Sequence, residues 1–141
     1  MTVDTWLGSA KKSLRLAALC SAMCGALCAA LPARAAWQLH VATATADHYA
    51  DDASLQALSG MRRVWELQDL RAPDARGVRS WRSFVEYDCR GARQRVLERS
   101  AFAGPKASGG ALAVETVDTA WTDVPSGSPA QAVLRWACQR P

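Results

Sequence analysis

The only two histidines of the chain, His40 and His48, precede two adjacent aspartates, Asp51 and Asp52. Imidazole nitrogens and carboxylate oxygens bind zinc in proteins, so this spacing could form a metal site. An extended strand, however, would carry His40 far from His48 unless the chain turned back between them. Exposed polar residues beside a strand and a turn account for the same four positions, and we predict no metal ligand among them.

Glu86 and Asp88 lie two positions apart, which puts both carboxylates on one face of a strand, where general acid–base chemistry is geometrically feasible. Arg82 and Arg90 flank them, and cross-strand ion pairs on a solvated face explain the pair more simply. The sequence has no Gly-x-Ser-x-Gly elbow, and the glycine-rich residues 104–110 lack the Lys-Ser/Thr ending of a phosphate loop. We therefore predict a protein that is not an enzyme and has no cofactor.

Residues 1–35 have the pattern of a cleavable signal peptide. Lys11, Lys12 and Arg15 precede an uncharged run of 16 residues, 16–31, which ends at Pro32 and is followed by Ala33-Arg34-Ala35. This order predicts cleavage after Ala35 or Ala36. A membrane-spanning helix needs about 20 apolar residues, so the run is too short for an anchor. We expect export to the periplasm or the cell surface.

Three of the five cysteines, Cys20, Cys24 and Cys28, lie four residues apart inside this apolar run. A helix would bring them to one face, but no charged residue lies among them, and the segment is predicted to be removed. The tripeptides before them do not fit a lipidation signal. We therefore expect neither a metal site nor a lipid there, and no stable membrane anchor after cleavage.

Cys89 and Cys138 are the two cysteines left after cleavage, and in a small exported domain such a pair predicts one disulfide bond. Two free thiols are the alternative. Closing a loop of 49 residues would stabilise the fold by about 4 kcal/mol in the chain-entropy description. The pairing requires α-carbons within about 7 Å of each other.

The remaining chain, residues 36–141, predicts one α+β domain: an antiparallel sheet of about five to six strands and a C-terminal helix. Residues 61–70 alternate, with Met61, Trp65 and Leu67 opposite Arg62, Glu66 and Gln68. Strands are also expected at residues 37–43, 78–89, 93–102 and 111–117, while residues 48–58 fit either a short strand or a helical turn. Residues 72–77 and 104–110 predict a turn and a loop.

The last element changes to the helical period. Ser128 is a good N-cap, and Pro129 suits the first helical position. Ala130, Val133, Leu134 and Ala137 then repeat on one face, so a helix ending near Cys138 is expected to pack on the sheet.

Residues 36–141 contain 13 basic and 12 acidic side chains, a net charge of only +1, so a nucleic-acid role lacks its electrostatic driving force. Twelve of the 13 basic residues are arginine, and five tryptophans accompany them. Arginine and tryptophan dominate protein-binding hot spots. We expect Trp65 and Trp81 in the core, and Trp121 and Trp136 as candidate contacts to a protein partner, with packing over the sheet edge as the alternative for Trp136.

A series of short motifs resembles the surface-adhesin protein E family over about residues 37–138. They are Val64-Trp65, Ser80, Tyr87-Asp88-Cys89, Gly109-Gly110, Trp121, Pro125-Ser126-Gly127-Ser128 and Cys138. The Pro-Ser-Gly-Ser turn is one residue longer than the family's usual Pro-Gly-Ser, and the lipidation cysteine of the founding adhesin is absent.

The resemblance implies an antiparallel sheet with a C-terminal helix tethered by a disulfide. It also implies an exported, non-enzymatic binding protein that contacts protein partners, among which extracellular-matrix and envelope proteins are expected. A periplasmic structural or stress-related envelope protein without an adhesive role is the alternative function.

Overall fold

The computed structural model describes residues 35–117 and 119–141. The predicted signal peptide, with Cys20, Cys24 and Cys28, lies outside the described residues except for Ala35. Ala35 and Ala36, the two predicted cleavage positions, form an exposed segment immediately before the first strand.

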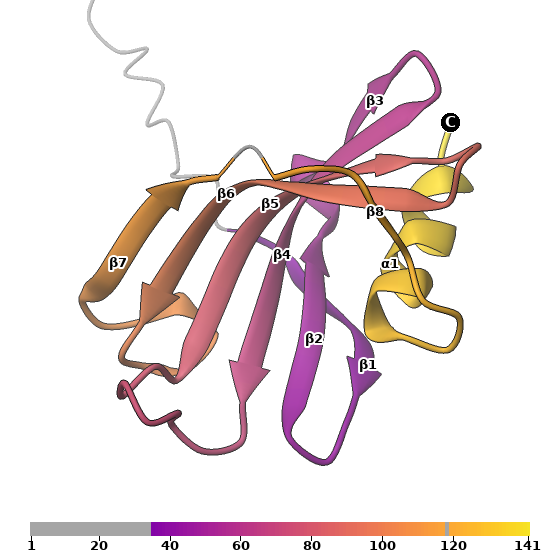
Figure 1. Ribbon diagram of the computed structural model, residues 1–141. Helices are drawn as coiled ribbons and strands as arrows, with labels where there is room; N and C mark the ends of the chain where they lie inside the picture. Colours follow the sequence, from indigo (N-terminus) through magenta and orange to yellow (C-terminus); the bar gives the residue numbers. More distant parts are fainter. Residues whose placement is uncertain (1–34, 118) are drawn as a thin grey trace, which may run out of the picture. The chain divides into compact units, whose positions relative to one another are not determined.

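One antiparallel sheet forms most of the domain (Figure 1). Its main path runs β1-β2-β4-β5-β6-β7; β3 pairs with β4, and β8 pairs with β6. The strands are β1 (Trp37–Ala42), β2 (Ala46–Asp51), β3 (Gln56–Leu58), β4 (Met61–Leu70), β5 (Ser80–Asp88), β6 (Arg93–Phe102), β7 (Ala111–Thr116) and β8 (Thr122–Asp123). Six strands in the main path and a helix at the C-terminus confirm the predicted fold class, and the two further strands, β3 and β8, are short.

The ambiguous residues 48–58 contain both predicted alternatives. Strand β2 ends at Asp51, whose side chain accepts a hydrogen bond from the amide of Ala53 and so caps the 3₁₀ turn η1 (Asp52–Ser54). The hydroxyl of Ser54 then accepts a hydrogen bond from the amide of Trp65 at 3.0 Å. This bond satisfies a backbone amide of β4 at the position where the neighbouring strand changes from β2 to β3.

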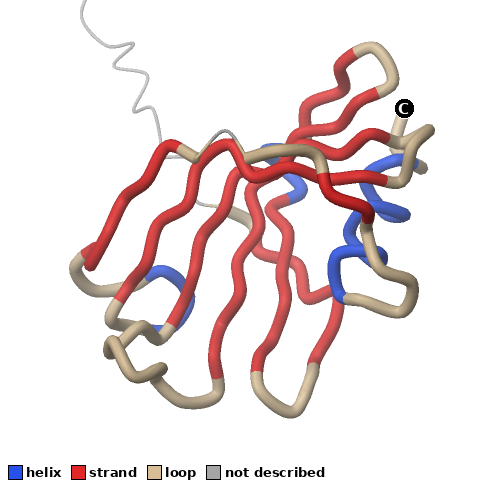
Figure 2. The backbone as a smooth tube through the Cα atoms, in the orientation of Figure 1, coloured by secondary structure: helices blue, strands red, loops and turns tan. Residues whose placement is uncertain are grey.

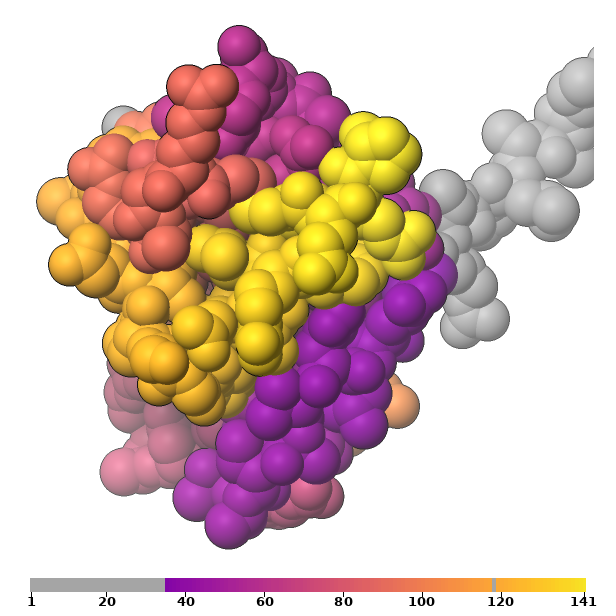
Figure 3. Space-filling model, turned by 90° about the vertical axis from the view of Figure 1, so that its right-hand side faces the viewer, coloured from indigo at the N-terminus to yellow at the C-terminus, as the bar shows by residue number. Residues whose placement is uncertain are grey.

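Helix α1 (Pro129–Cys138) begins as the sequence predicts, because the Ser128 side chain accepts a hydrogen bond from the Gln131 amide and Pro129 occupies the first turn. It packs against β1 and β4 and lies across one side of the sheet (Figure 3). Its buried face contributes Val133 and Leu134 to a core with Ala50, Val64, Val85 and Tyr87. No helix among the described residues is long and apolar enough to cross a membrane.

Cys89, directly after β5, and Cys138, the last residue of α1, form the predicted disulfide, with their α-carbons 5.7 Å apart. Cys138 also packs against the core under α1. The bond therefore joins the end of the helix to the end of β5, an inner strand of the sheet.

The face of the sheet away from α1 is partly covered as well, which the sequence did not predict. The connection between β6 and β7, with the 3₁₀ turn η2 (Pro105–Ala107), folds back over this face. Buried Ser80 fastens it, because its hydroxyl donates to the Gly104 carbonyl at 2.7 Å and accepts from the Ala107 amide at 2.9 Å. The path of the connection is visible in the backbone tube (Figure 2).

Strand β4 is consequently buried on both faces: Val64 contributes to the core under α1, and Leu67, on the opposite face, is also buried. The expectation that Trp65 and Trp81 belong to the core is wrong, since both are half-buried. Each ring is instead covered by arginine guanidinium groups.

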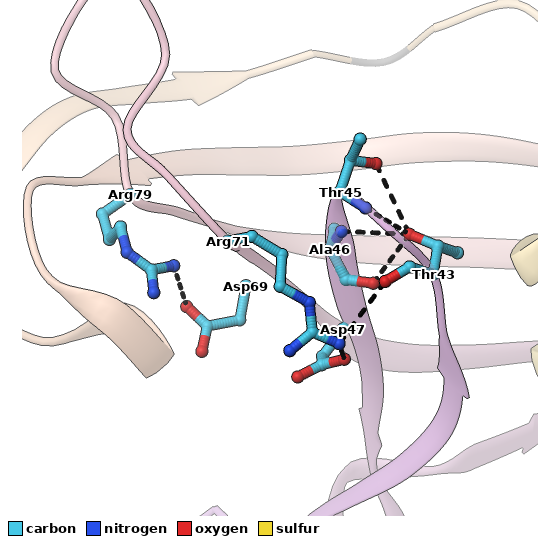
Figure 4. A network of polar contacts seen from close by, with 7 residues as sticks. All are labelled: Thr43, Thr45, Ala46, Asp47, Asp69, Arg71 and Arg79. Carbon is cyan, nitrogen blue, oxygen red and sulfur yellow. Dashed lines mark hydrogen bonds and ion pairs between the residues drawn. The ribbon is translucent and has the colours of Figure 1, made fainter.

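Ion pairs hold together the loops at one end of the sheet (Figure 4). Arg71 pairs with Asp47 at 2.6 Å, and Arg79 pairs with Asp69 at 3.2 Å. The Thr43 hydroxyl donates to the Ala46 carbonyl and closes the β1–β2 turn. These contacts hold the loops at this end of the sheet in place. The candidate sites lie elsewhere on the two faces of the sheet.

Candidate binding surfaces

The strand register assigns the side chains to two faces, because residues directly opposite in an antiparallel pair lie on the same face. Val64 pairs with Val85, and Val85 with Val96, on the face covered by α1. The neighbouring pairs belong to the opposite face. We call their surface the arginine–aromatic face; it consists of Arg63, Trp65, Arg82, Phe84, Glu86, Asp88, Arg93, Arg95 and Trp121.

Two rings lie side by side at the centre of the arginine–aromatic face. Trp65 of β4 and Phe84 of β5 are opposite in register, and their ring centroids are 5.0 Å apart. The guanidinium of Arg82 lies 4.7 Å from the Trp65 ring and 5.6 Å from that of Phe102. Arg82 forms no ion pair with any described carboxylate, and its buried Nε has no hydrogen-bond partner. A stacked but unpaired guanidinium can still bind an external carboxylate.

A nearly buried carboxylate joins the arginines of this face. Glu86 accepts hydrogen bonds from Nε of Arg63 on β4, at 2.7 Å, and from Nε of Arg95 on β6, at 2.6 Å. Desolvation acts to raise the pKa of Glu86, but the hydrogen bonds and charges of the two arginines lower it below its ordinary value. The predicted cross-strand ion pairs are confirmed, although Glu86 is 3 % exposed rather than solvated and its partners are not Arg82 and Arg90.

Asp88 is bound in the same way, at the turn after β5. Its carboxylate accepts a hydrogen bond from the Arg93 guanidinium at 2.7 Å and further hydrogen bonds from the backbone amides of Arg90 and Gly91. The hydrogen bond from Arg93, followed by that from Gly91, lowers the pKa of Asp88. A methyl group at Gly91 would lie 2.5 Å from a carboxylate oxygen of Asp88, so this position has no room for a side chain. Both carboxylates are thus structural and not available for acid–base chemistry.

The two predicted contact tryptophans lie in different environments. Trp121 is half-buried, with the guanidinium groups of Arg95 and Arg93 at 4.9 and 5.6 Å from its ring, and it extends the arginine–aromatic face toward β8. Trp136 lies on α1, with the His40 ring at 4.8 Å and the Arg140 guanidinium at 5.4 Å. It also packs against the core under the helix.

A groove of about 320 Å³ lies on the face of the sheet that α1 covers, between the sheet and the start of the helix. We call it the helix-side groove. Its polar and aromatic lining comes from four strands and includes His48, Glu66, Gln68, Trp81, Ser83 and Arg99, while Pro125 and Pro129 lie at its helical side. Sequence reasoning missed this groove, because it depends on where α1 crosses the sheet.

Glu66 and buried Tyr87 are hydrogen-bonded to each other beside the groove. Desolvation raises the pKa of Glu66 to about 7, although the hydrogen bond from Tyr87 acts to lower it. Desolvation, followed by the charge of Glu66, raises the pKa of Tyr87 well above its ordinary value. No described basic group forms an ion pair with Glu66.

The histidines and aspartates of the N-terminal region do not converge. His40 contacts Trp136, His48 lines the helix-side groove, and Asp51 caps η1. Desolvation lowers the pKa of each histidine. Among the described residues, no group of three or more histidine, cysteine or acidic side chains is arranged to hold a metal ion.

Comparison with known proteins agrees with this architecture. A family model described as Surface-adhesin protein E matches residues 37–139. The fold is similar to that of Haemophilus influenzae protein E in its crystal form II, with a TM-score of 0.56 and 11 % sequence identity over 75 % of this chain and 89 % of that chain. No curated protein sequence matches the chain. The match to the family model covers the whole sheet, both disulfide cysteines and the helix, and on this evidence the chain belongs to the surface-adhesin protein E family.

Proposed function

We propose that this chain is an exported, non-enzymatic binding protein that contacts a protein partner through the arginine–aromatic face. The observation that carries the proposal is the stacked set of Trp65, Phe84 and Arg82 on a sheet face that α1 does not cover. Tryptophan and arginine are enriched in protein-binding hot spots, where rings supply buried area and guanidinium groups bind carboxylates.

The arrangement of charge on this face also indicates which chemical groups the partner presents. Arg63 and Arg95 share Glu86, and Arg93 is paired with Asp88, so each of these guanidinium groups already has a carboxylate partner. Arg82 has no ion-pair partner among the described carboxylates. We infer that the partner presents an aspartate or glutamate to Arg82 beside an apolar side chain that covers Trp65 and Phe84. The near-neutral charge of residues 36–141 agrees with a protein partner rather than a nucleic acid.

Membership of an adhesin family supports export and binding, and extracellular-matrix or envelope proteins are the proposed partners. The periplasm and the cell surface are the proposed locations. Fractionation of cells with surface labelling distinguishes them, because only a surface-displayed protein reacts with a reagent that cannot enter intact cells.

The test measures binding of oxidised residues 36–141 to a panel of purified matrix glycoproteins and envelope proteins. Arg82→Ala is compared with Arg76→Ala, a matched control, because Arg76 also stacks on a tryptophan, Trp81, but outside the arginine–aromatic face. We expect Arg82→Ala to weaken the tightest interaction at least tenfold and Arg76→Ala to leave it within about twofold. Equal affinities for the two variants, or no binding to any panel protein, would contradict the proposal.

A further inference from the structure

The helix-side groove combines a carboxylate with apolar walls. Glu66 of β4 and Ser83 of β5 lie opposite each other in register within the groove, and Gln68 lies beside them. Val85, Val96 and the Trp81 ring form apolar surfaces around these polar groups. Such a lining, mostly apolar with a few directed polar groups, is typical of binding sites, whose volumes begin at about 300 Å³.

The carboxylate of Glu66 is incompletely satisfied. Tyr87 supplies one hydrogen bond, and no described lysine or arginine forms an ion pair with Glu66. Carboxylates in desolvated positions are normally paired with a cation, because an isolated charge is costly there. Glu86 and Asp88, two other carboxylates with buried side chains on this sheet, follow that rule and have arginine partners, and buried Asp51 accepts hydrogen bonds from two backbone amides instead.

Three other charged or titratable groups face this part of the groove. Tyr87 is the hydrogen-bond donor, His48 comes from β2, and Arg99 comes from β6. Desolvation lowers the pKa of His48, so its ring is neutral at pH 7. The Arg99 guanidinium is stacked on Trp81 at 4.5 Å, at the exposed rim, where it is screened by water. Neither group neutralises Glu66.

We propose that the helix-side groove binds one basic side chain, lysine or arginine, of a protein partner, with its cationic head group at Glu66 and its methylene stem against Val85, Val96 and Trp81. The head group supplies the missing counter-charge and the hydrogen-bond donors, and Gln68 and Ser83 accept from it. The long apolar stem of a basic side chain matches the apolar walls. A divalent metal ion fits poorly, because one carboxylate supplies too few charged ligands.

This inference rests on the proposed function only in assigning the side chain to a protein partner, since the groove and the arginine–aromatic face lie on opposite sides of the sheet. It also predicts a pH dependence. Because Glu66 has a pKa of about 7, raising the pH from 6 to 8 increases its ionised fraction about tenfold, and binding of a cation strengthens in proportion. Protonation of His48 at the acid end acts in the same direction, so the measurement is repeated with His48→Gln.

The experiment uses Nα-acetyl-lysine methylamide and Nα-acetyl-arginine methylamide as probes, with the neutral citrulline analogue as the matched ligand. Binding to oxidised residues 36–141 is followed by amide chemical shifts. The variants are Glu66→Gln, which keeps an acceptor for Tyr87 and so preserves the fold, and Glu98→Gln, the same change on β6 outside the groove.

We expect at least one cationic probe to shift groove amides at pH 8 and to bind at least tenfold more weakly to Glu66→Gln, with Glu98→Gln unchanged. Equal binding of the citrulline analogue, equal binding to Glu66→Gln, or absence of binding by both cations would overturn the inference. None of these results bears on Arg82→Ala, so failure of the groove proposal is distinguishable from failure of the arginine–aromatic face.

Discussion

The hydroxyl group of Tyr87 donates a hydrogen bond to the carboxylate of Glu66, joining β5 to β4 on the side of the sheet that α1 covers. Desolvation raises the pKa of Glu66 to about 7, whereas an unfolded chain would leave it near its ordinary value of 4.5. The folded protein therefore binds a proton between these two pH values that the unfolded protein has released. The wild-type protein should lose stability as the pH rises from about 4.5 to 7.

Glu66→Gln should abolish this slope. The amide oxygen still accepts from Tyr87, and no charge has to be kept in the desolvated position. Above pH 7 we expect the variant to be more stable than the wild-type protein by about 1–3 kcal/mol, and near pH 4 the two should differ little. Urea unfolding followed by tryptophan fluorescence measures the difference across the pH range. A difference that stays constant with pH would show that Glu66 keeps an ordinary pKa.

Glu86 should show the opposite dependence. Its folded-state pKa is lowered by Arg63 and Arg95, so its stabilising contribution is present above about pH 4.5 and is lost as the pH falls through the folded value. Glu86→Gln should cost about 1–3 kcal/mol at pH 7 and much less at pH 3. Glu98→Gln, on β6 and on the same face of the sheet, serves as the control. A cost that persists undiminished at pH 3 would argue for lost packing instead of lost ion pairs.

Reduction of the disulfide should destabilise the domain. The bond between Cys89 and Cys138 closes a loop with a sequence separation of 49, for which chain entropy predicts a contribution of about 4 kcal/mol. Urea unfolding with and without a reductant measures this contribution. The double variant Cys89→Ala/Cys138→Ala is the control and should not respond to the reductant. A wild-type protein equally stable in both conditions would mean that α1 is held by its core contacts alone.

The position of signal cleavage should affect stability. The backbone nitrogen of Ala36 lies 3.0 Å from a carboxylate oxygen of Asp51, a residue only 7 % exposed. Cleavage after Ala35 would turn this nitrogen into a terminal ammonium group and create an ion pair, whereas cleavage after Ala36 would remove it.

A protein that begins at Ala36 should thus be more stable than one that begins at Trp37, by about 1–2 kcal/mol. Mass spectrometry of the exported protein identifies the natural terminus. Asp51→Asn should reduce the difference between the two forms, and a difference that survives this substitution would exclude the ion pair as its cause.

Local sequence signals predicted the elements of the fold well. Ser128 and Pro129 indicated the start of α1, the alternation of residues 61–70 matches β4, and the two remaining cysteines identified the disulfide between the end of α1 and the end of β5. Each of these signals is contained in a short segment or follows from counting cysteines. The resemblance to the adhesin family rests on the same local motifs.

The candidate sites could not be predicted in this way, because they depend on register and on long-range coverage. Glu66 and Tyr87 are 21 residues apart, and they meet only through the pairing of β4 with β5. Trp65 and Leu67 lie on one face of β4, yet only Leu67 is buried. Alternation indicates two faces but not which part of a face another segment covers.

The central claim, binding through the arginine–aromatic face, is tested most directly by the two tryptophans that the sequence singled out. Trp121 stacks with Arg93 and Arg95 on that face, whereas Trp136, on α1, packs against the His40 ring of β1. The measurement is the dissociation constant of Trp121→Ala and Trp136→Ala for the panel protein that the wild-type chain binds most tightly, after circular dichroism has established that both variants are folded. We predict at least tenfold weaker binding by Trp121→Ala and little change for Trp136→Ala; unchanged binding by Trp121→Ala together with weakened binding by Trp136→Ala would contradict the account and assign the contact to the helix side.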